Sequence, residues 1–167
     1  LGLPEEAVPG DILLSELLFH PQTGGEDFVE LFNVSDKVVN LKGWMFENRL
    51  KESGNTLQSF DNDFLIFPGE YVAVSAEPED ILRRYEVPAP GRLAQNDLPT
   101  LEAGQGNITL RRSDSLIIDA FDYDEGLHFS LLENKRGVSL ERLSFDQPTQ
   151  SSGNWHSAAE SAGYATP

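Results

Sequence analysis

Apolar and polar residues alternate along much of this chain with a period of two, which places successive side chains on opposite faces of a β-strand. The clearest case is the segment 27–33, where Phe28, Glu30 and Phe32 share one face and the residues between them share the other. A polar turn at residues 35–37 separates this run from a second apolar run. The two runs predict a β-hairpin or arch rather than a helix.

Short runs of this kind recur between turn residues through the chain. Residues 107–112 and 116–123 alternate on either side of a Ser113-Asp114 turn and predict a hairpin. The first strand is expected over residues 11–19, with a candidate bulge at Ser15-Glu16. One helix is expected from Glu79 to Tyr85, because a proline precedes it, acids start it and arginines end it. The pattern predicts an all-β, immunoglobulin-like sandwich of about eight or nine strands with one short helix.

A chain of 167 residues fits one domain with a substantial core. Residues 1–10 hold two prolines and two acids and predict a linker, followed by one domain over residues 11–167. No apolar run approaches the ~20 residues of a membrane helix, so membrane insertion is not expected. The first residues lack the basic start and apolar stretch of a signal peptide, and we expect a domain of a longer protein.

Four segments of the chain resemble, in the same order, motifs of the lamin tail domain, an immunoglobulin-like sandwich found in nuclear lamins and many secreted bacterial proteins. Together they span about residues 10–167. They are residues 12–17 with Pro21, residues 26–33 with the corner 41–44, residues 67–74, and residues 137–142 with Asn154-Trp155 and the closing 163–167. The last of these is similar to the bacterial branch, although that branch usually ends closer to Gly-Gly-Thr-Pro than to the Gly163-Tyr164-Ala165-Thr166-Pro167 of this chain.

The resemblance implies a non-catalytic interaction, adhesion or spacer module of a larger exported bacterial protein, located outside the cell or at its surface. Its partners would be a protein or a surface polymer, beside neighbouring domains of the same chain. One alternative is a targeting module that delivers a neighbouring nuclease or hydrolase to a surface polymer. A further alternative is a carbohydrate-binding domain or small enzyme, and clustered exposed aromatic residues would distinguish a sugar binder from a spacer.

The charge of the chain argues against one property of lamins. Twelve Lys and Arg residues against 28 Asp and Glu residues give a net charge of −16. Nucleic-acid binding draws on basic side chains that contact phosphates, so no nucleic-acid partner is expected. Adjacent basic residues occur at Arg83-Arg84, Arg111-Arg112 and Lys135-Arg136. Cysteine is absent, which excludes disulfides and thiolate chemistry.

Several charged and aromatic residues have structural roles as their main expectation. Glu16 and Glu30 lie on strands that are neighbours in the family, and with Arg142 they are expected to form a partly buried Glu–Arg cluster that fixes strand order. A catalytic carboxylate pair is the weaker alternative, because nothing in the spacing supplies a cleft. The tryptophans Trp44 and Trp155 are expected as core anchors rather than ligand platforms. The structural set is Glu16, Glu30, Trp44, Glu141, Arg142 and Trp155.

A second acidic group gathers at the end of a predicted strand and in its loop, and comprises Asp119, Asp122, Asp124 and Glu125. Calcium takes six to eight oxygen ligands, which clustered acids and backbone carbonyls can supply. The spacing departs from the EF-hand pattern, so a solvated loop is the main expectation and a calcium site the alternative. No other cofactor is expected. His20, His128 and His156 are far apart, and no motif indicates an enzyme.

Overall fold

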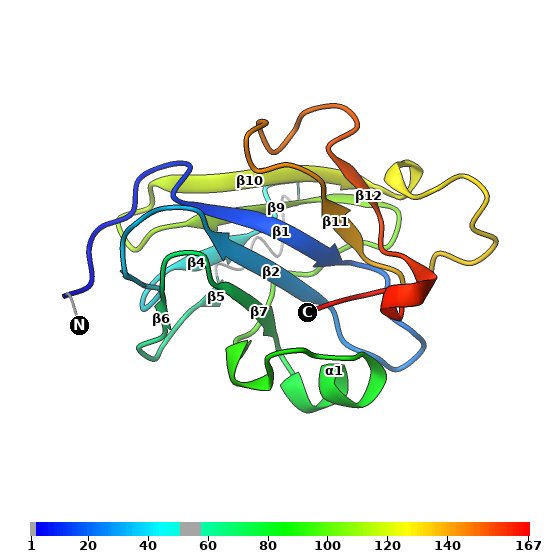
Figure 1. Ribbon diagram of the computed structural model, residues 1–167, viewed down its shortest axis with the longest axis horizontal. Coiled ribbons are helices and arrows are strands. Elements are labelled where there is room, and N and C mark those ends of the chain that lie inside the picture. The colour runs from blue at the N-terminus through cyan, green and yellow to red at the C-terminus, as the bar shows by residue number, and fades with distance from the viewer. Residues whose placement is uncertain (1–2, 51–57) are drawn as a thin grey trace.

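Two β-sheets face each other in the computed structural model, which describes residues 3–50 and 58–167 (Figure 1). The six-stranded sheet has the order β12-β11-β1-β2-β7-β8, the four-stranded sheet has the order β10-β9-β4-β5, and β3 pairs with β6. The strands are β1 (Ile12–Leu18), β2 (Phe28–Asn33), β3 (Val39–Asn40), β4 (Met45–Glu47), β5 (Gln58–Ser59), β6 (Leu65–Ile66), β7 (Tyr71–Ser75), β8 (Leu93–Gln95), β9 (Gln105–Arg111), β10 (Ile117–Asp124), β11 (Leu140–Arg142) and β12 (Trp155–Ser157). The predicted all-β sandwich is confirmed.

The described residues form twelve strands, more than the sequence predicts. The two that the sequence pattern misses are β8 and β12, at the two edges of the six-stranded sheet. Each is three residues long, too short for a period of two to stand out. Both form because an edge of a sheet offers unpaired backbone groups to the next segment of chain. By contrast, the predicted hairpin of β9 and β10 is confirmed.

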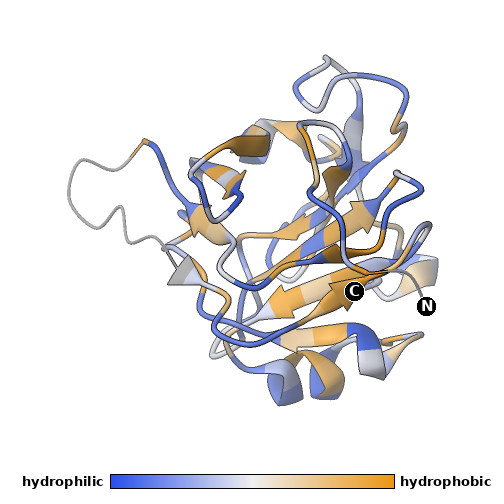
Figure 2. Cartoon of the chain, turned by 90° about the vertical axis from the view of Figure 1, so that its left-hand side faces the viewer, coloured by the Kyte–Doolittle hydropathy of each residue, from blue (hydrophilic) through white to orange (hydrophobic). Residues whose placement is uncertain are grey.

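Alternation along the strands builds the core between the sheets. On β2 the inward residues are Val29 and Leu31, which alternate with the outward Phe28, Glu30 and Phe32. On the neighbouring β7 they are Val72 and Val74, and all four inward residues are fully buried. Apolar side chains of the opposite sheet meet them, and Figure 2 shows apolar residues along the facing strands. The outward residues of the six-stranded sheet are therefore free to form a second surface, on which the candidate site lies.

Part of that outer surface is covered by the helix α1 (Pro78–Arg84), which agrees with the predicted helix to within one residue at each end. Asp80 accepts hydrogen bonds from both Arg83 and Arg84, and from the backbone N–H of Glu26. Ile81 of the helix packs in a second apolar cluster with Leu18, Phe28 and other outward residues of the sheet. The helix covers one end of the outer face and leaves its middle open (Figure 1).

The run after β2 forms an arch, because β2 lies in the six-stranded sheet whereas β3 pairs with β6. Asn33 is fully buried and holds the arch by donating hydrogen bonds from its side chain to the carbonyls of Lys37 and Ile66. The segment expected as a linker also contacts the sandwich. The N–H of Glu5 donates to the carbonyl of Val38, and Ala7 is buried in the core. No helix among the described residues is long and apolar enough to span a membrane.

Candidate functional site: a pocket with three glutamates

Three glutamates lie side by side on the outer face of the six-stranded sheet. Glu16 of β1 is the register partner of Glu30 on β2 and also of Glu141 on β11. Register partners on one face of a sheet have Cβ atoms about 5 Å apart, and like charges in these positions destabilise the pairing. A row of three carboxylates across three central strands is therefore an arrangement that strand stability alone disfavours.

A bulge in β1 places Glu16 in this row. The register between β1 and β2 shifts between Leu14 and Glu16, which confirms the bulge that the sequence predicts at Ser15. The extra residue allows Leu14 and Leu17 both to point into the core, although an odd number of positions separates them. Ser15 then lies beside the glutamates, and its Oγ donates a 2.7 Å hydrogen bond to Oε1 of Glu30.

The carboxyl-terminal residues close one side of the row. Oε1 of Glu16 accepts hydrogen bonds from Oγ of Ser139 at 2.5 Å and from the N–H of Thr166 at 2.9 Å. Oγ1 of Thr166 lies 3.2 Å from Oε2 of Glu16 and 3.2 Å from Oε1 of Glu141. A hydroxyl has one proton, so it donates to only one of these two carboxylates when both are ionised.

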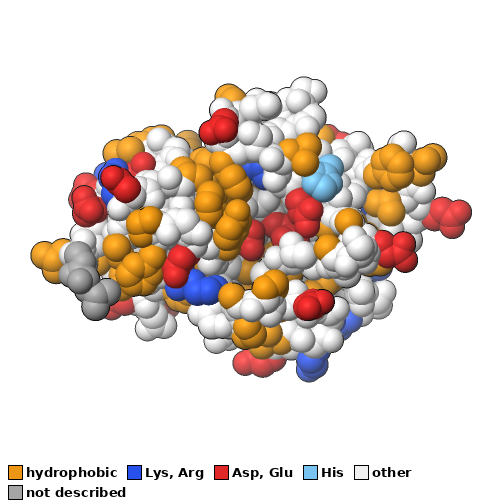
Figure 3. Space-filling model, in the orientation of Figure 1, with side chains coloured by type: hydrophobic (Ala, Val, Ile, Leu, Met, Phe, Trp, Pro, Cys, Tyr) orange, Lys and Arg blue, Asp and Glu red, His pale blue; other side chains and the backbone are white. Residues whose placement is uncertain are grey.

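The glutamates lie in a pocket of about 630 Å³ that opens on the outer face, and we call it the glutamate pocket. Figure 3 shows acidic side chains gathered in a hollow at the middle of this face, between apolar side chains. Acidic, apolar and other polar residues line the pocket. They are Ser15, Glu16, Glu30, Glu70, Tyr71, Ala73, Pro88, Ala89, Arg92, Glu141, Arg142, Phe145, Thr166 and Pro167.

Two aromatic rings form one wall of the pocket. Tyr71 stacks on Phe32 with ring centroids 4.2 Å apart, and Phe145 packs on the same Phe32 at 4.5 Å. Tyr71 is partly exposed, so a face of this aromatic group is accessible from the pocket side. The pocket thus combines carboxylates with an apolar wall, the combination of a few polar groups and hydrophobic lining that is typical of ligand sites.

The predicted cluster of Glu16 and Glu30 with Arg142 is wrong. Arg142 follows Glu141 on β11, and adjacent residues on a strand point to opposite faces, so only Glu141 shares the face of Glu16. The guanidinium of Arg142 instead contacts Asp119 of the opposite sheet, with Nη1 and Oδ2 3.5 Å apart. At the pocket rim, Arg92 pairs with Glu70 at 2.9 Å.

Burial of the glutamates changes their ionisation. Glu16 is 3% exposed and Glu30 7% exposed. Desolvation raises the pKa of Glu16 to about 7, against hydrogen bonds from Ser139 and Thr166 that act in the other direction. Desolvation, together with the charge of Glu16, raises the pKa of Glu30 to about 8, because the hydrogen bond from Ser15 offsets only part of the cost. Strongly raised carboxyl pKa values in a pocket mark a functional-site candidate.

These shifts predict that Glu30→Gln stabilises the domain at alkaline pH. The folded protein keeps protons on Glu16 and Glu30 that the unfolded chain, with pKa values near 4.5, has released. The stability that the folded protein gains by holding these two protons is therefore fully present below about pH 4.5. It is lost as the pH rises through the folded-state pKa values of about 7 and about 8. Glutamine imitates the protonated form, so we expect an increase of about 1–3 kcal/mol in the free energy of unfolding at about pH 8.

Urea unfolding of both proteins across the pH range measures this effect. The difference between Glu30→Gln and the parent should shrink as the pH falls toward about 5, where the glutamate is protonated in the folded state. The comparison is between variants because His128, whose pKa burial lowers to about 4, makes the parent less stable at acid pH and so acts oppositely. A difference that stays constant with pH would show that Glu30 is ionised throughout.

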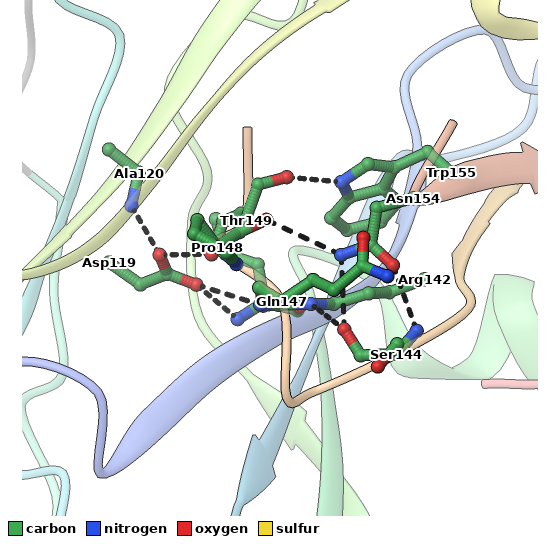
Figure 4. A network of polar contacts seen from close by, with 10 residues as sticks. Asp119, Ala120, Arg142, Ser144, Gln147, Pro148, Thr149, Asn154 and Trp155 are labelled. Carbon is green, nitrogen blue, oxygen red and sulfur yellow. Dashed lines mark hydrogen bonds and ion pairs between the residues drawn. The ribbon is translucent and has the colours of Figure 1, made fainter. Parts of the chain in front are cut away.

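Arg142 belongs to a separate buried network between the two sheets (Figure 4). Its guanidinium donates to the carbonyls of Leu14, Ser144 and Gln147 at 3.2, 3.0 and 2.7 Å. Asp119 in turn accepts hydrogen bonds from the N–H of Leu14 and from Oγ1 of Thr149. The network ties the irregular segment after β11 to both sheets, so Arg142 and Asp119 have a structural role.

The tryptophans are core residues, as the sequence predicts. Trp44 is 3% exposed and lies in the main core. Trp155 is 5% exposed, stacks on Phe121 with centroids 4.1 Å apart, and donates from Nε1 to the carbonyl of Thr149 at 2.8 Å. Neither indole presents a flat surface to solvent, so neither serves as a ligand platform.

The four acids of the candidate calcium site lie on two sides of β10. Asp119 points inward with Phe121 and uses both carboxylate oxygens in the network of Figure 4. Asp122 and Asp124 point outward, and Asp124 accepts a hydrogen bond from the N–H of Gly126 in the short 3-10 helix Glu125–Leu127. Within residues 3–50 and 58–167, no group of three or more His, Cys, Asp or Glu residues is placed to hold a metal ion. Calcium binding by these four acids stays a prediction.

Two facing sheets with a mixed six-stranded layer define an immunoglobulin-like β-sandwich, a class in which function resides in surface sites rather than in the fold itself. Residues 5–125 match the model of the Lamin Tail Domain family, and the chain belongs to this family. The family is one of non-catalytic immunoglobulin-like domains. A comparison with curated proteins finds no match. Glu16 and Glu30 lie inside the matched range, whereas Glu141 and Thr166 lie beyond it.

Proposed function

We propose that this domain is a non-catalytic interaction module of a larger exported protein and acts at the cell surface in adhesion or as a spacer. The observation that supports the proposal best is the glutamate pocket, which combines buried carboxylates with an aromatic wall on the open face of the sandwich. The Lamin Tail Domain family to which the chain belongs is non-catalytic, so binding is the use that such a pocket suggests. Charged and aromatic residues that can bind a partner therefore lie together in one pocket. A role as an exported protein rests on the resemblance to the secreted branch of the family.

The described residues offer little for catalysis. Nδ1 of His128 lies 3.0 Å from Oγ of Ser157, but that Oγ already accepts a hydrogen bond from the N–H of Phe129. Burial lowers the pKa of His128 to about 4, which makes it a poor base near neutral pH. Its buried Nε2 has no hydrogen-bond partner among the residues that the structure describes, so no carboxylate orients the ring as in a catalytic triad.

Carbohydrate binding has less support than protein binding. Sugar-binding modules stack their ligands on exposed aromatic rings, but both tryptophans are buried. The aromatic residues exposed among the described positions are Tyr71 and Phe129, and they line different cavities. The exposed rings therefore do not form one platform.

Deletion of residues 5–167 from the full-length protein tests the proposal. The fraction retained at the cell envelope would be compared with the fraction released into the medium, for the intact and the deleted protein. We expect deletion to shift the protein into the medium and to leave the activity of any neighbouring catalytic domain unchanged. Unaltered retention, or a loss of catalytic activity that the isolated domain restores, would reject the interaction role.

We expect no binding to double-stranded DNA at about 150 mM salt, because non-specific binding requires basic side chains free to contact phosphates. In two of the three adjacent basic pairs the arginines each contact a carboxylate of the chain: Asp80 for Arg83 and Arg84, Glu47 for Arg111, and Asp114 for Arg112. The third pair is Lys135-Arg136, in which Lys135 donates to the carbonyl of Glu125. A gel-shift assay at micromolar protein measures this. A shifted band that Arg111→Ala/Arg112→Ala abolishes would instead indicate a chromatin-type role.

A further inference from the structure

The glutamate pocket has more hydrogen-bond acceptors than the described part of the chain has donors for them. Oε1 of Glu30 accepts from Ser15, whereas Oε2 has no hydrogen-bond partner among the described residues and is not one of their buried atoms, so it faces the pocket. Thr166 supplies one hydroxyl proton for two carboxylates, those of Glu16 and Glu141. Acceptors that face an open pocket and lack a donor from the described residues are available to donors from another molecule.

Within residues 3–50 and 58–167, no lysine or arginine compensates the charge of the row. Arg92 on the rim is paired with Glu70, and its guanidinium lies 5.1 Å above the ring of Phe64. The guanidinium of Arg142 pairs with Asp119 on the inner side. The nearest basic group to the row is His156, whose Nε2 is 3.6 Å from Oε2 of Glu141 and carries charge only when protonated. A positive group from outside would therefore stabilise the ionised glutamates.

The pattern of occupied oxygens selects the kind of cation. An arginine pairs best with both oxygens of one carboxylate. Here both oxygens of Glu16 have donors nearby, Oε1 of Glu30 is taken by Ser15, and Oε1 of Glu141 faces Thr166. Oε2 of Glu30 remains for a ligand, and among the described residues Oε2 of Glu141 has only Nε2 of His156 near it, at 3.6 Å and beyond hydrogen-bond distance. The compact ammonium of a lysine has three N–H donors and can donate to single oxygens of several carboxylates. The planar guanidinium of an arginine is shaped to donate to both oxygens of one carboxylate instead.

We propose that the glutamate pocket binds the ammonium group of a lysine side chain presented by a partner protein. The inference rests on the proposed interaction function and specifies the ligand of that site. The four-carbon stem of the lysine packs along the wall formed by Tyr71 and Phe145, while its ammonium reaches the free oxygens of Glu30 and Glu141. The net charge of −16 favours approach of a basic partner surface.

The probe is Nα-acetyl-lysine methylamide, titrated into the 15N-labelled chain and followed by the amide signals of Ser15, Glu30 and Thr166. A single side chain should bind with a dissociation constant on the order of 1 mM. Binding should be tighter at about pH 8 than at about pH 6, since protonated glutamates do not attract a cation. Three comparison ligands are titrated in the same way. They are the uncharged Nα-acetyl-norleucine methylamide, the arginine analogue Nα-acetyl-arginine methylamide, and calcium chloride at equal ionic strength.

At about pH 8, where Glu30 begins to ionise, Glu30→Gln should weaken binding of the lysine probe about tenfold or more, because it removes a charged acceptor. Glu133→Gln, which makes the same charge change at an exposed position, should leave binding unaltered. Thermal melting of Glu30→Gln confirms that the variant is folded, and Glu141→Gln provides a second test of the row. Equal binding of norleucine, tighter binding of arginine, saturation by calcium at lower concentration, or no signal from any probe would each overturn the proposal.

The retention assay distinguishes a failure of this inference from a failure of the proposed function. If deletion of residues 5–167 releases the full-length protein but Glu30→Gln does not, the domain is an interaction module that works through another surface. If deletion has no effect, the interaction role fails regardless of what the probe binds. Release by both changes is the result that we expect.

Discussion

Replacement of Arg142 by methionine is expected to lower the free energy of unfolding by about 3–5 kcal/mol, the cost of removing one partner from a buried ion pair. The Arg142 side chain is 1% exposed and that of Asp119 is 9% exposed, so the variant leaves a carboxylate without its counter-ion between the sheets. It also removes the hydrogen bonds that Arg142 donates to the carbonyls of Leu14 and Gln147. Urea unfolding, followed by the fluorescence of the two tryptophans, measures the loss.

Two controls give the result its meaning. Arg136→Met removes an exposed arginine and should change stability by less than about 0.5 kcal/mol. Asp119→Leu combined with Arg142→Met removes both charges and should recover part of the loss, because no unpaired charge remains. A double variant as unstable as Arg142→Met alone would mean that the hydrogen bonds to carbonyls, rather than the ion pair, account for the effect.

Trp44→Ala is expected to cost about 3–5 kcal/mol, the usual range for a large aromatic residue lost from a core. The indole packs between the sheets, and the backbone around it is fixed by hydrogen bonds between Trp44 and both Leu41 and Phe60. Gly43 before it has φ near +74°, a conformation that favours glycine, so the corner cannot easily rearrange to fill the cavity. The measurement is again urea unfolding, here followed by circular dichroism.

Fluorescence provides an independent check of the position of Trp44. In a Trp155→Phe background the remaining emission comes from Trp44 and should be blue-shifted and protected from iodide quenching. Trp155→Phe alone serves as the control and should cost less, because phenylalanine retains part of the stacking on Phe121. Red-shifted emission open to quencher would contradict the buried position.

The sequence predicts faces of strands better than partners between strands. The period of two in residues 27–33 correctly places Glu30 with Phe28 and Phe32, away from the core. Residues an odd number of positions apart on a regular strand point to opposite faces, which separates Glu141 from Arg142 and Asp119 from Asp122. Strict use of this rule would have argued against the Glu–Arg cluster and against the four-acid calcium site. Alternation along a strand cannot predict the register between strands, because the pairing of Glu16 with Glu141 joins segments more than a hundred residues apart.

The pocket itself could not be predicted from local pattern. Its walls come from irregular segments, including Pro88 and Ala89 before β8 and Phe145 after β11, which have no periodicity to interpret. Thr166 reaches Glu16 only because the chain turns at Gly163 and Tyr164, both with φ near +70°. Tyrosine is uncommon in that conformation, so its sequence gives no sign of the turn. The raised pKa of Glu30 follows from its burial and from the neighbouring charge of Glu16, and the local pattern could not foresee it either.

The position of Thr166 matters when the domain carries mechanical load, as a spacer at a surface would. Tension applied through Pro167 acts on the two contacts of Thr166 with Glu16 before it reaches β12, the last strand of the chain. Together with the contact between Thr166 and Glu141 they are only three among the described residues, so we expect them to rupture at lower force than the paired strands behind them. Detachment of the last residues would uncover Glu16 and widen the pocket while the sandwich stays intact. A pulled domain would therefore hold a cationic partner differently from a relaxed one.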